Sequence, residues 1–72
     1  MKKKFKIDVD CAVCAAKLEE AIRRVKGVEE CQVNFLTQKM MLRTTDEGFD
    51  EVLAEVLRTA KRVEPDAVIY TD

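Results

Sequence analysis

The sequence of 72 residues has no histidine and no tryptophan, and it contains only two glycines and one proline. Without histidine, any metal site in the chain must use sulfur or oxygen donors. Because 47% of the residues are hydrophobic, the scarcity of glycine and proline indicates a folded globule rather than a disordered tail. No apolar run approaches the roughly 20 residues of a membrane-spanning helix. No signal-peptide core is present either, so we expect no direct membrane insertion.

The chain also lacks a dominant charge. Thirteen basic residues nearly cancel fourteen acidic ones, so the overall balance does not call for nucleic acid. The only basic run, Lys2-Lys3-Lys4, has no aromatic stacking platform and is interpreted as a solvated strand entrance. A chain of this length has room for a single domain, residues 1–72, and none for a catalytic domain. We therefore expect a binding module and not an enzyme.

Three cysteines, an odd number, fit poorly with a secreted disulfide framework. They fit a reducing compartment in which thiols stay free, and so predict a cytoplasmic protein. In that setting the close pair Cys11 and Cys14 is metal-binding or redox-active. The third, Cys31, shares an apolar face with Val33 and Phe35 and is expected to pack in the core.

The pattern of apolar residues predicts six elements. Four segments alternate between apolar and polar residues, as half-buried strands do; they cover residues 5–9, 28–35, 40–44 and 67–70. Two segments place apolar residues three and four positions apart, as amphipathic helices do; they cover residues 15–25 and 49–62. Gly27 supplies a left-handed stop, Thr45-Asp46 offers an N-cap to the second helix, and Pro65 closes it.

The order of these elements is strand, helix, strand, strand, helix, strand. Each helix has one apolar stripe and the strands have one apolar face, so two helices should cover one side of a four-stranded antiparallel sheet. The short link Leu36-Thr37-Gln38 should join the middle strands as a hairpin. The predicted class is therefore α+β, with the ferredoxin-like βαββαβ arrangement.

Cys11 and Cys14 lie between the end of a strand and the start of a helix. A helix N-terminus favours thiolates, which are the form of cysteine that binds metals. Asp10 precedes the pair and is either a third ligand or the N-cap of the helix. A carboxylate beside two thiolates favours Zn(II) or a similar divalent ion over Cu(I). A fourth ligand would come from water, the backbone, a partner, Glu64 or Asp66.

Two other functions remain open at this point. Two thiolates alone suit Cu(I), which tolerates low coordination, so a Cu(I) metallochaperone or copper ATPase domain is the first alternative. A dithiol oxidoreductase of the thioredoxin type also places Cys-x-x-Cys at a helix start and is the second alternative. The intervening Ala12-Val13, in place of Gly-Pro or a Pro-aromatic pair, weighs against the redox function.

Three stretches of sequence resemble a known family. They are the decapeptide from Asp10 to Glu19 (DCAVCAAKLE), Gly27-Val28, and Gln32-Val33-Asn34-Phe35. Together they resemble the heavy-metal-associated domains of metallochaperones and of metal-transporting P-type ATPases. An aspartate directly before the first cysteine is similar to the zinc, cadmium and lead branch, as is Glu64-Pro65-Asp66. The family's usual Gly-Met before this position is Asp8-Val9 here.

The resemblance implies a domain that binds and transfers a soft or borderline divalent metal through Cys11, Cys14 and Asp10. Zn(II) is the first expectation, with Cd(II) or Pb(II) as alternatives. The implied partners are the metal ion and either a transmembrane ATPase core or a metal donor or acceptor protein. The domain would then be the cytosolic part of a membrane transporter or a free chaperone, and we expect it to be a monomer.

Overall fold

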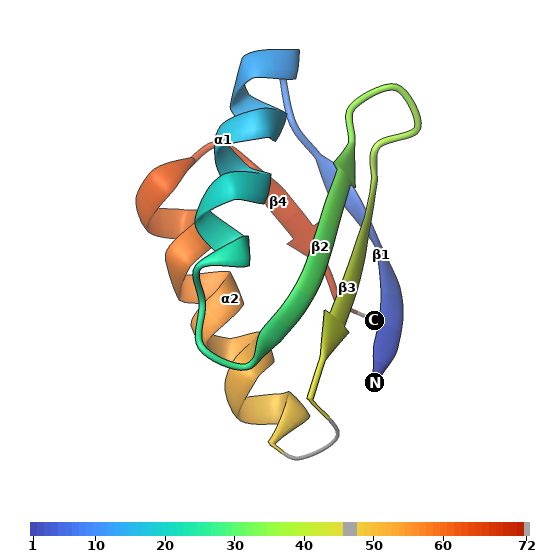
Figure 1. Ribbon diagram of the computed structural model, residues 1–72. Coiled ribbons are helices and arrows are strands. Elements are labelled where there is room, and N and C mark those ends of the chain that lie inside the picture. The colour runs from blue at the N-terminus through green and yellow to red at the C-terminus, as the bar shows by residue number, and fades with distance from the viewer. Residues whose placement is uncertain (46–47, 72) are drawn as a thin grey trace.

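The computed structural model describes residues 1–45 and 48–71 of the protein (Figure 1). Six elements follow one another in the predicted order. They are β1 (Lys2–Asp8), α1 (Ala12–Arg23), β2 (Val28–Asn34), β3 (Lys39–Thr44), α2 (Phe49–Val63) and β4 (Val68–Tyr70). No helix in these two ranges is long and apolar enough to cross a membrane.

The four strands form one antiparallel sheet with the order β2-β3-β1-β4. Both helices lie against the same face of this sheet, and the other face is uncovered (Figure 1). The predicted ferredoxin-like fold is therefore confirmed. Because β1 pairs with β4 through Asp8 and Val68, the residues after β1 and those before β4 lie at the same end of the molecule.

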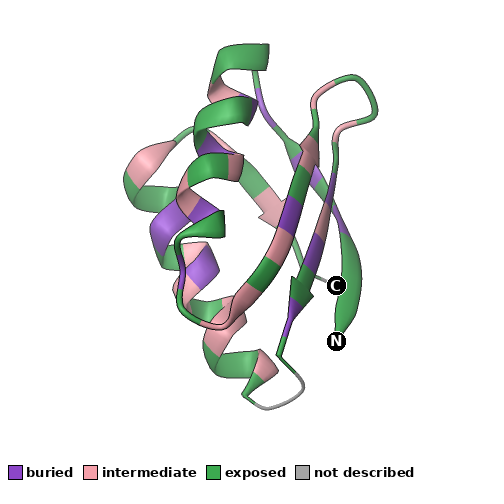
Figure 2. Ribbon diagram, in the orientation of Figure 1, coloured by how far each residue is buried: buried purple, intermediate pink, exposed green. Residues whose placement is uncertain are grey.

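The core lies between the sheet and the helices (Figure 2). The buried residues are those that the two periodicities predicted: alternate positions of the strands and one face of each helix. They include Ile7, Leu18, Ile22, Met40, Leu42 and Val56, each at most 1% exposed. The same alternation leaves every second strand residue on the uncovered face of the sheet.

Most predicted element boundaries differ from the structure by one to three residues, and three of the differences bear on the site or on the turns. Helix α1 begins at Ala12 rather than Ala15, so Cys14 lies in its first turn. Helix α2 has Gly48 at its N-cap position, so the prediction of a Thr45 cap is wrong, and Asp46 lies outside the described residues. The hairpin connection, predicted as Leu36-Thr37-Gln38, covers residues 35–38, because β2 ends at Asn34 and β3 begins at Lys39. Burial repeats along the sequence of an element, but turns and caps depend on single residues. The ends of elements are therefore harder to predict than their buried faces.

Cys31 is fully buried in the core, as predicted. Burial is the main reason that the pKa of its thiol is raised to about 12, with the negative charge of Glu19 adding to the effect. This thiol therefore stays protonated and is shielded from metal ions.

Replacing Cys31 should change stability and leave metal binding intact. Cys31→Ser places a hydroxyl in an apolar site and should lower the free energy of unfolding by about 1–3 kcal/mol. Cys31→Ala, which adds no polar group, is the matched control and should cost less. Urea titrations of the reduced protein measure stability, and a metal titration measures stoichiometry. Loss of bound metal in either variant would contradict the core role of Cys31.

Candidate metal centre

The Cys-x-x-Cys segment occupies the turn between β1 and α1. Strand β1 ends at Asp8, and Val9 continues inward, where it is buried. Asp10 is exposed, and Cys11 and Cys14 are both partly exposed. The turn, the β2–β3 loop and the connection from α2 to β4 all lie toward the same end of the molecule (Figure 1). The two predicted cysteine ligands therefore stand at an open end of the fold.

Cys11 is the N-cap of α1. Its backbone is extended, and its sulfur accepts a hydrogen bond from the backbone N–H of Cys14 at 3.2 Å. A side-chain acceptor of this kind satisfies one of the free N–H groups at a helix start. The alternative interpretation of Asp10 as the cap is therefore wrong. Among the described residues, the Asp10 carboxylate has no hydrogen-bond or ion-pair partner.

The two thiols are linked electrostatically. The close approach of the two thiol groups lowers the pKa of Cys11 and raises the pKa of Cys14 to about 11. Desolvation adds to the rise at Cys14. A metal binds both sulfurs as thiolates, so metal binding through this pair would release the protons that the thiols carry.

Glu64, the residue after α2, lies beside the thiol pair. Its negative charge raises the pKa of both Cys11 and Cys14. The fold thus brings one of the two suggested extra donors to the site. Within residues 1–45 and 48–71, however, no three Cys, Asp or Glu side chains converge as a preformed metal site. The two thiols are the preorganised part of the centre, and a carboxylate has to move toward them.

Gln38, a residue that the sequence patterns did not single out, holds the start of the loop from Val9 to Cys14 in place. We call this segment the metal loop. Its side-chain oxygen accepts a hydrogen bond from the Val9 N–H at 2.8 Å, and its backbone oxygen accepts one from the Ile7 N–H at 2.9 Å. Its side-chain nitrogen donates to the Phe35 carbonyl at 2.6 Å. Gln38 therefore joins the hairpin loop to the strand end that precedes Cys11. No local pattern reports a contact between residues 29 positions apart.

The three cysteines should react with iodoacetamide in a fixed order. The thiolate is the reactive form, so Cys11, whose pKa is lowered, should be labelled first near pH 7.5. Cys14 should follow as the pH rises toward its pKa of about 11, and buried Cys31 should be labelled only on unfolding. Mass spectrometry of peptides from the reduced, metal-free protein measures this order. Faster labelling of Cys14 than of Cys11 would contradict this order of the two thiol pKa values.

Fold and site together define the class of protein: a small α+β domain that presents two neighbouring thiols at the start of its first helix. Residues 4–62 match the family described as heavy-metal-associated domain. The chain belongs to this family. The family is one of small metal-binding modules, and the chain is therefore not itself an enzyme.

Similar proteins include transporters of different metals. The chain is 47% identical over 34 residues to a zinc/cadmium/lead-transporting P-type ATPase of Escherichia coli, covering 47% of this chain and 5% of that protein. It is 36% identical over 50 residues to the probable copper-transporting ATPase PacS of Synechocystis, covering 69% and 7% respectively. This chain thus matches only a small part of each transporter. The N-terminal domain of ZntA in its apo form has a TM-score of 0.65 at 28% identity, covering 99% of this chain and 90% of that one.

The relatives divide between copper transporters and zinc, cadmium and lead transporters. They establish a heavy-metal-associated domain related to those of metal-transporting ATPases. The choice of metal has to come from the donor atoms of this chain.

Proposed function

We propose that this domain binds Zn(II), or the related ions Cd(II) and Pb(II), through Cys11, Cys14 and Asp10, and passes the ion to a partner. Two thiolates and one carboxylate are donors that suit Zn(II), which favours about four ligands. The fourth place is open to Glu64, water or a donor of the partner. The observation that carries the proposal is that Asp10 directly precedes Cys11 in the chain and that its carboxylate is not used by the helix cap.

Charge supports a divalent ion. Two thiolates and a carboxylate sum to −3, so Cu(I) would leave a net charge of about −2, whereas Zn(II) would leave about −1. Glu64 adds a further negative charge beside the thiols, as its effect on both thiol pKa values shows. This end of the protein therefore favours the ion with the higher charge.

The surroundings of the site suit exchange with another protein. Val13, between the two cysteines, is 64% exposed, and Leu36, in the loop at the same end, is 90% exposed. Large apolar side chains on the surface beside a binding site commonly mark a contact with a partner. Partner ligands would replace Cys11, Cys14 and Asp10 one at a time, because the open site leaves room for a second protein.

The likeness to short segments of two P-type ATPases supports a particular setting. In this proposal the domain is the cytosolic metal-binding part of a metal efflux ATPase, or a free carrier that serves one. Its partners are the transmembrane core of that ATPase or a donor or acceptor protein, and it acts as a monomer.

A Cu(I) carrier is the second candidate. It is favoured by one observation: only the two thiols are preorganised among the described side chains, and two thiolates are enough for Cu(I).

Competition of the reduced protein with chromophoric zinc and copper chelators, followed by X-ray absorption at the metal edge, tests the proposal. We expect one Zn(II) per chain, with two sulfur neighbours and oxygen neighbours completing the shell. Binding of Cu(I) with two sulfurs, together with failure to retain Zn(II) against a weak chelator, would establish the copper carrier instead.

A further inference from the structure

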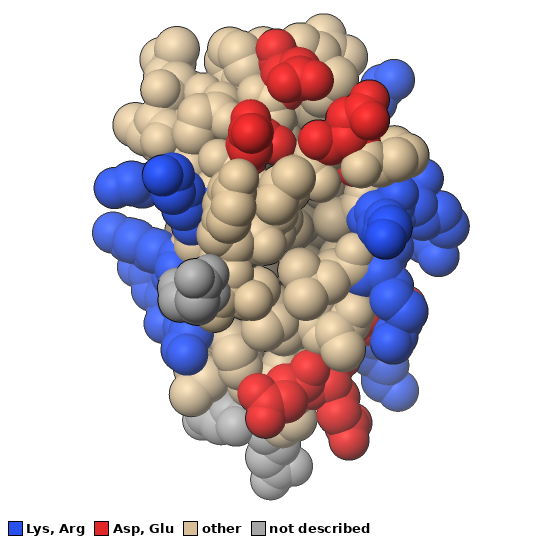
Figure 3. Space-filling model, turned by 180° about the vertical axis from the view of Figure 1, so that it is seen from behind, with Lys and Arg blue, Asp and Glu red and all other residues tan. Residues whose placement is uncertain are grey.

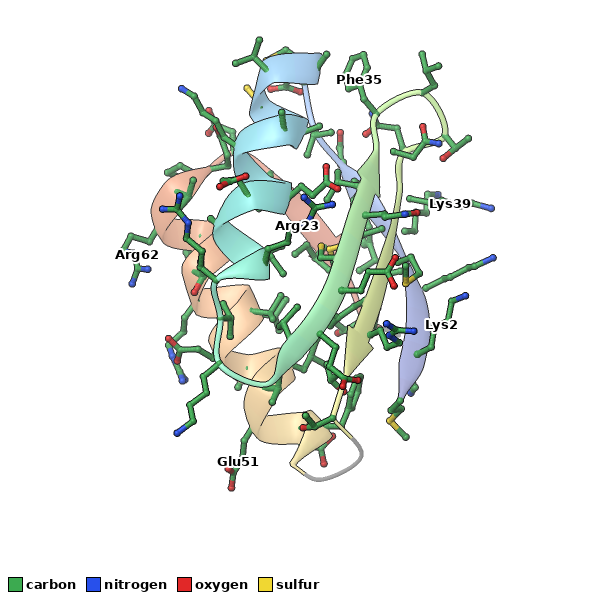
Figure 4. The ribbon with its side chains drawn as sticks, viewed as in Figure 1. Lys2, Arg23, Phe35, Lys39, Glu51 and Arg62 are labelled. Atoms are coloured by element: carbon green, nitrogen blue, oxygen red, sulfur yellow. The ribbon has the colours of Figure 1, made fainter. Side chains whose placement is uncertain are left out.

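The uncovered face of the sheet carries a cluster of positive charge, which we call the basic face. Side chains of alternate strand residues point away from the helices, as Figure 4 shows for Lys2 and Lys39. The basic face has five cationic positions, all exposed: Lys2, Lys4, Lys6, Lys39 and Arg43. Among the described residues that share its register positions, the acidic ones are Glu30 and, at the metal end, Asp8.

Strand pairing places these cations directly opposite one another. Lys2 faces Arg43, and Lys6 faces Lys39, across the β1–β3 ladder. Like charges at opposite positions on one face destabilise a sheet. Arg43 has an ion-pair partner in Glu30, at 3.4 Å. The remaining repulsion would be relieved by an external anion.

The helical side of the molecule is different. Three of its arginines pair with glutamates of the same helix: Arg23 with Glu19, Arg24 with Glu20, and Arg58 with Glu55. Seen from behind, basic side chains line both sides of the molecule, whereas acidic ones gather toward its two ends (Figure 3). Helices α1 and α2 carry five basic and five acidic residues, whereas the basic face has five cations and two acidic residues among its described positions, so its charge is the less compensated of the two.

The basic face also has a place for an anionic group. A shallow hollow of about 200 Å³ opens between Lys4 and Lys39. Gln32, Asn34 and Thr37, which line it together with Met40 and Met41, bring amide and hydroxyl groups that can donate hydrogen bonds. Two ammonium groups with neutral hydrogen-bond donors beside them match the chemistry of a phosphate oxygen.

We propose that the basic face docks on an anionic lipid surface, with a lipid phosphate in the hollow between Lys4 and Lys39. We favour a lipid surface over other polyanions because the cations are spread over a broad sheet of four strands. They form two adjacent columns, one along β1 and one along β3. Four of the five cations are lysines, whose flexible ammonium groups act as point charges. They lack the planar bidentate geometry with which arginine recognises a particular phosphate or base. Tyr70, at the β4 edge, is the aromatic residue among its described positions, so bases have little platform to stack on.

This orientation leaves the metal loop accessible. Cys11 and Cys14 lie at the end of the molecule and not on the basic face, so a docked domain would hold them at the rim (Figure 1). Lipid binding would therefore restrict the search for a membrane-bound partner without covering the metal. The inference does not depend on the identity of the metal, and the metal-free protein can test it.

Co-sedimentation with phosphatidylcholine vesicles, with and without about one third phosphatidylglycerol, measures the partition coefficient of the reduced apo protein. The test variant is Lys4→Gln/Lys6→Gln/Lys39→Gln. Its matched control removes three unpaired lysines from outside the sheet, as Lys17→Gln/Lys26→Gln/Lys61→Gln. Each lysine near an anionic surface contributes about fivefold, so the test variant should lose on the order of a hundredfold. The control should keep most of its binding.

We expect the wild-type protein to bind only the vesicles that contain phosphatidylglycerol, and salt to weaken this binding. Circular dichroism checks that the variants fold, and a Zn(II) titration checks that they bind metal as the wild type does. Equal losses in the test and control variants would overturn the proposal, because only net charge would then matter. Absence of wild-type binding, equal binding to neutral vesicles, or tighter binding to single-stranded oligonucleotides at the same salt would also overturn it.

Discussion

Cys11→Ser and Cys14→Ser should each lower Zn(II) affinity by at least two orders of magnitude. Apparent zinc binding of about 10–16 kcal/mol in four-ligand sites corresponds to about 2.5–4 kcal/mol for each ligand, or on the order of a hundredfold to several hundredfold. The hydroxyl of serine stays protonated at neutral pH and is a poor substitute for a thiolate. Loss of one sulfur should therefore leave a site too weak to compete with a chelator.

These two variants separate metal binding from folding. Serine is a preferred N-cap residue, so Cys11→Ser should keep the bond to the Cys14 N–H and the start of α1. Chelator competition measures affinity, and circular dichroism of the apo variants measures folding. Wild-type zinc affinity in either variant would contradict the dithiol site. Because Cys31→Ala also removes one sulfur, it is the control for non-specific loss of a thiol.

Gly27→Ala should be strongly destabilising. Gly27 has φ of +96°, a conformation that costs other residues about 1–2 kcal/mol. A Cβ atom there would also lie 2.5 Å from Cγ2 of Val52 on α2, and relieving such an overlap in packed structure costs typically 1–3 kcal/mol. Together these costs should lower the free energy of unfolding by about 2–5 kcal/mol, a large part of the stability of a small domain. Urea denaturation of the reduced apo protein measures it.

Gly48→Ala is the matched control for this prediction. Gly48 also has a positive φ, of +70°, but among the described residues its Cβ would meet only the Oε2 atom of Glu51, at 4.0 Å. The Gly48→Ala variant should therefore have the backbone strain alone, which should lower its free energy of unfolding by about 1–2 kcal/mol. Equal losses at the two glycines would show that the contact between Gly27 and Val52 has no energetic weight.

Burial patterns predicted the fold because they repeat. Alternation at Phe5, Ile7 and Val9, and spacings of three and four at Leu18 and Ile22, report which side of an element faces the core. The order of the elements then allowed few ways to cover one sheet with two helices. Element ends were predicted less well, because a cap depends on one side chain and one backbone conformation.

At the candidate metal centre, too, some features could be predicted from the sequence and others could not. The spacing of Cys11 and Cys14 predicted that both thiols would stand at a helix start, which the structure confirms. Statistics of helix caps favoured Asp10 for a position that the Cys11 sulfur occupies. Two other features of the site depend on contacts between distant segments. They are the hydrogen bond from the Val9 N–H to the Gln38 side chain and the approach of Glu64 to the thiols. Such contacts exist only once the sheet has formed, so a single sequence does not reveal them.

The sheet gives one further example. In the sequence, Lys2-Lys3-Lys4 is a short run that would be solvated in any strand. In the structure Lys3 lies on the helical side, with its ammonium 5.3 Å from the centre of the Phe49 ring. Lys2 and Lys4 instead join cations of β3, more than 30 positions away in the sequence, on the basic face. Pairing, and not local composition, creates that surface.

The central claim is that Asp10 makes the dithiol site selective for a divalent metal. Parallel competition titrations of Zn(II) and Cu(I), with the wild type, Asp10→Asn and Asp10→Ala, test it most directly. Both variants should lose zinc affinity by about 10- to 100-fold, and should keep or gain Cu(I) affinity because a negative charge is gone. Unchanged zinc affinity in Asp10→Ala, together with preferred retention of Cu(I) by the wild type, would contradict the claim.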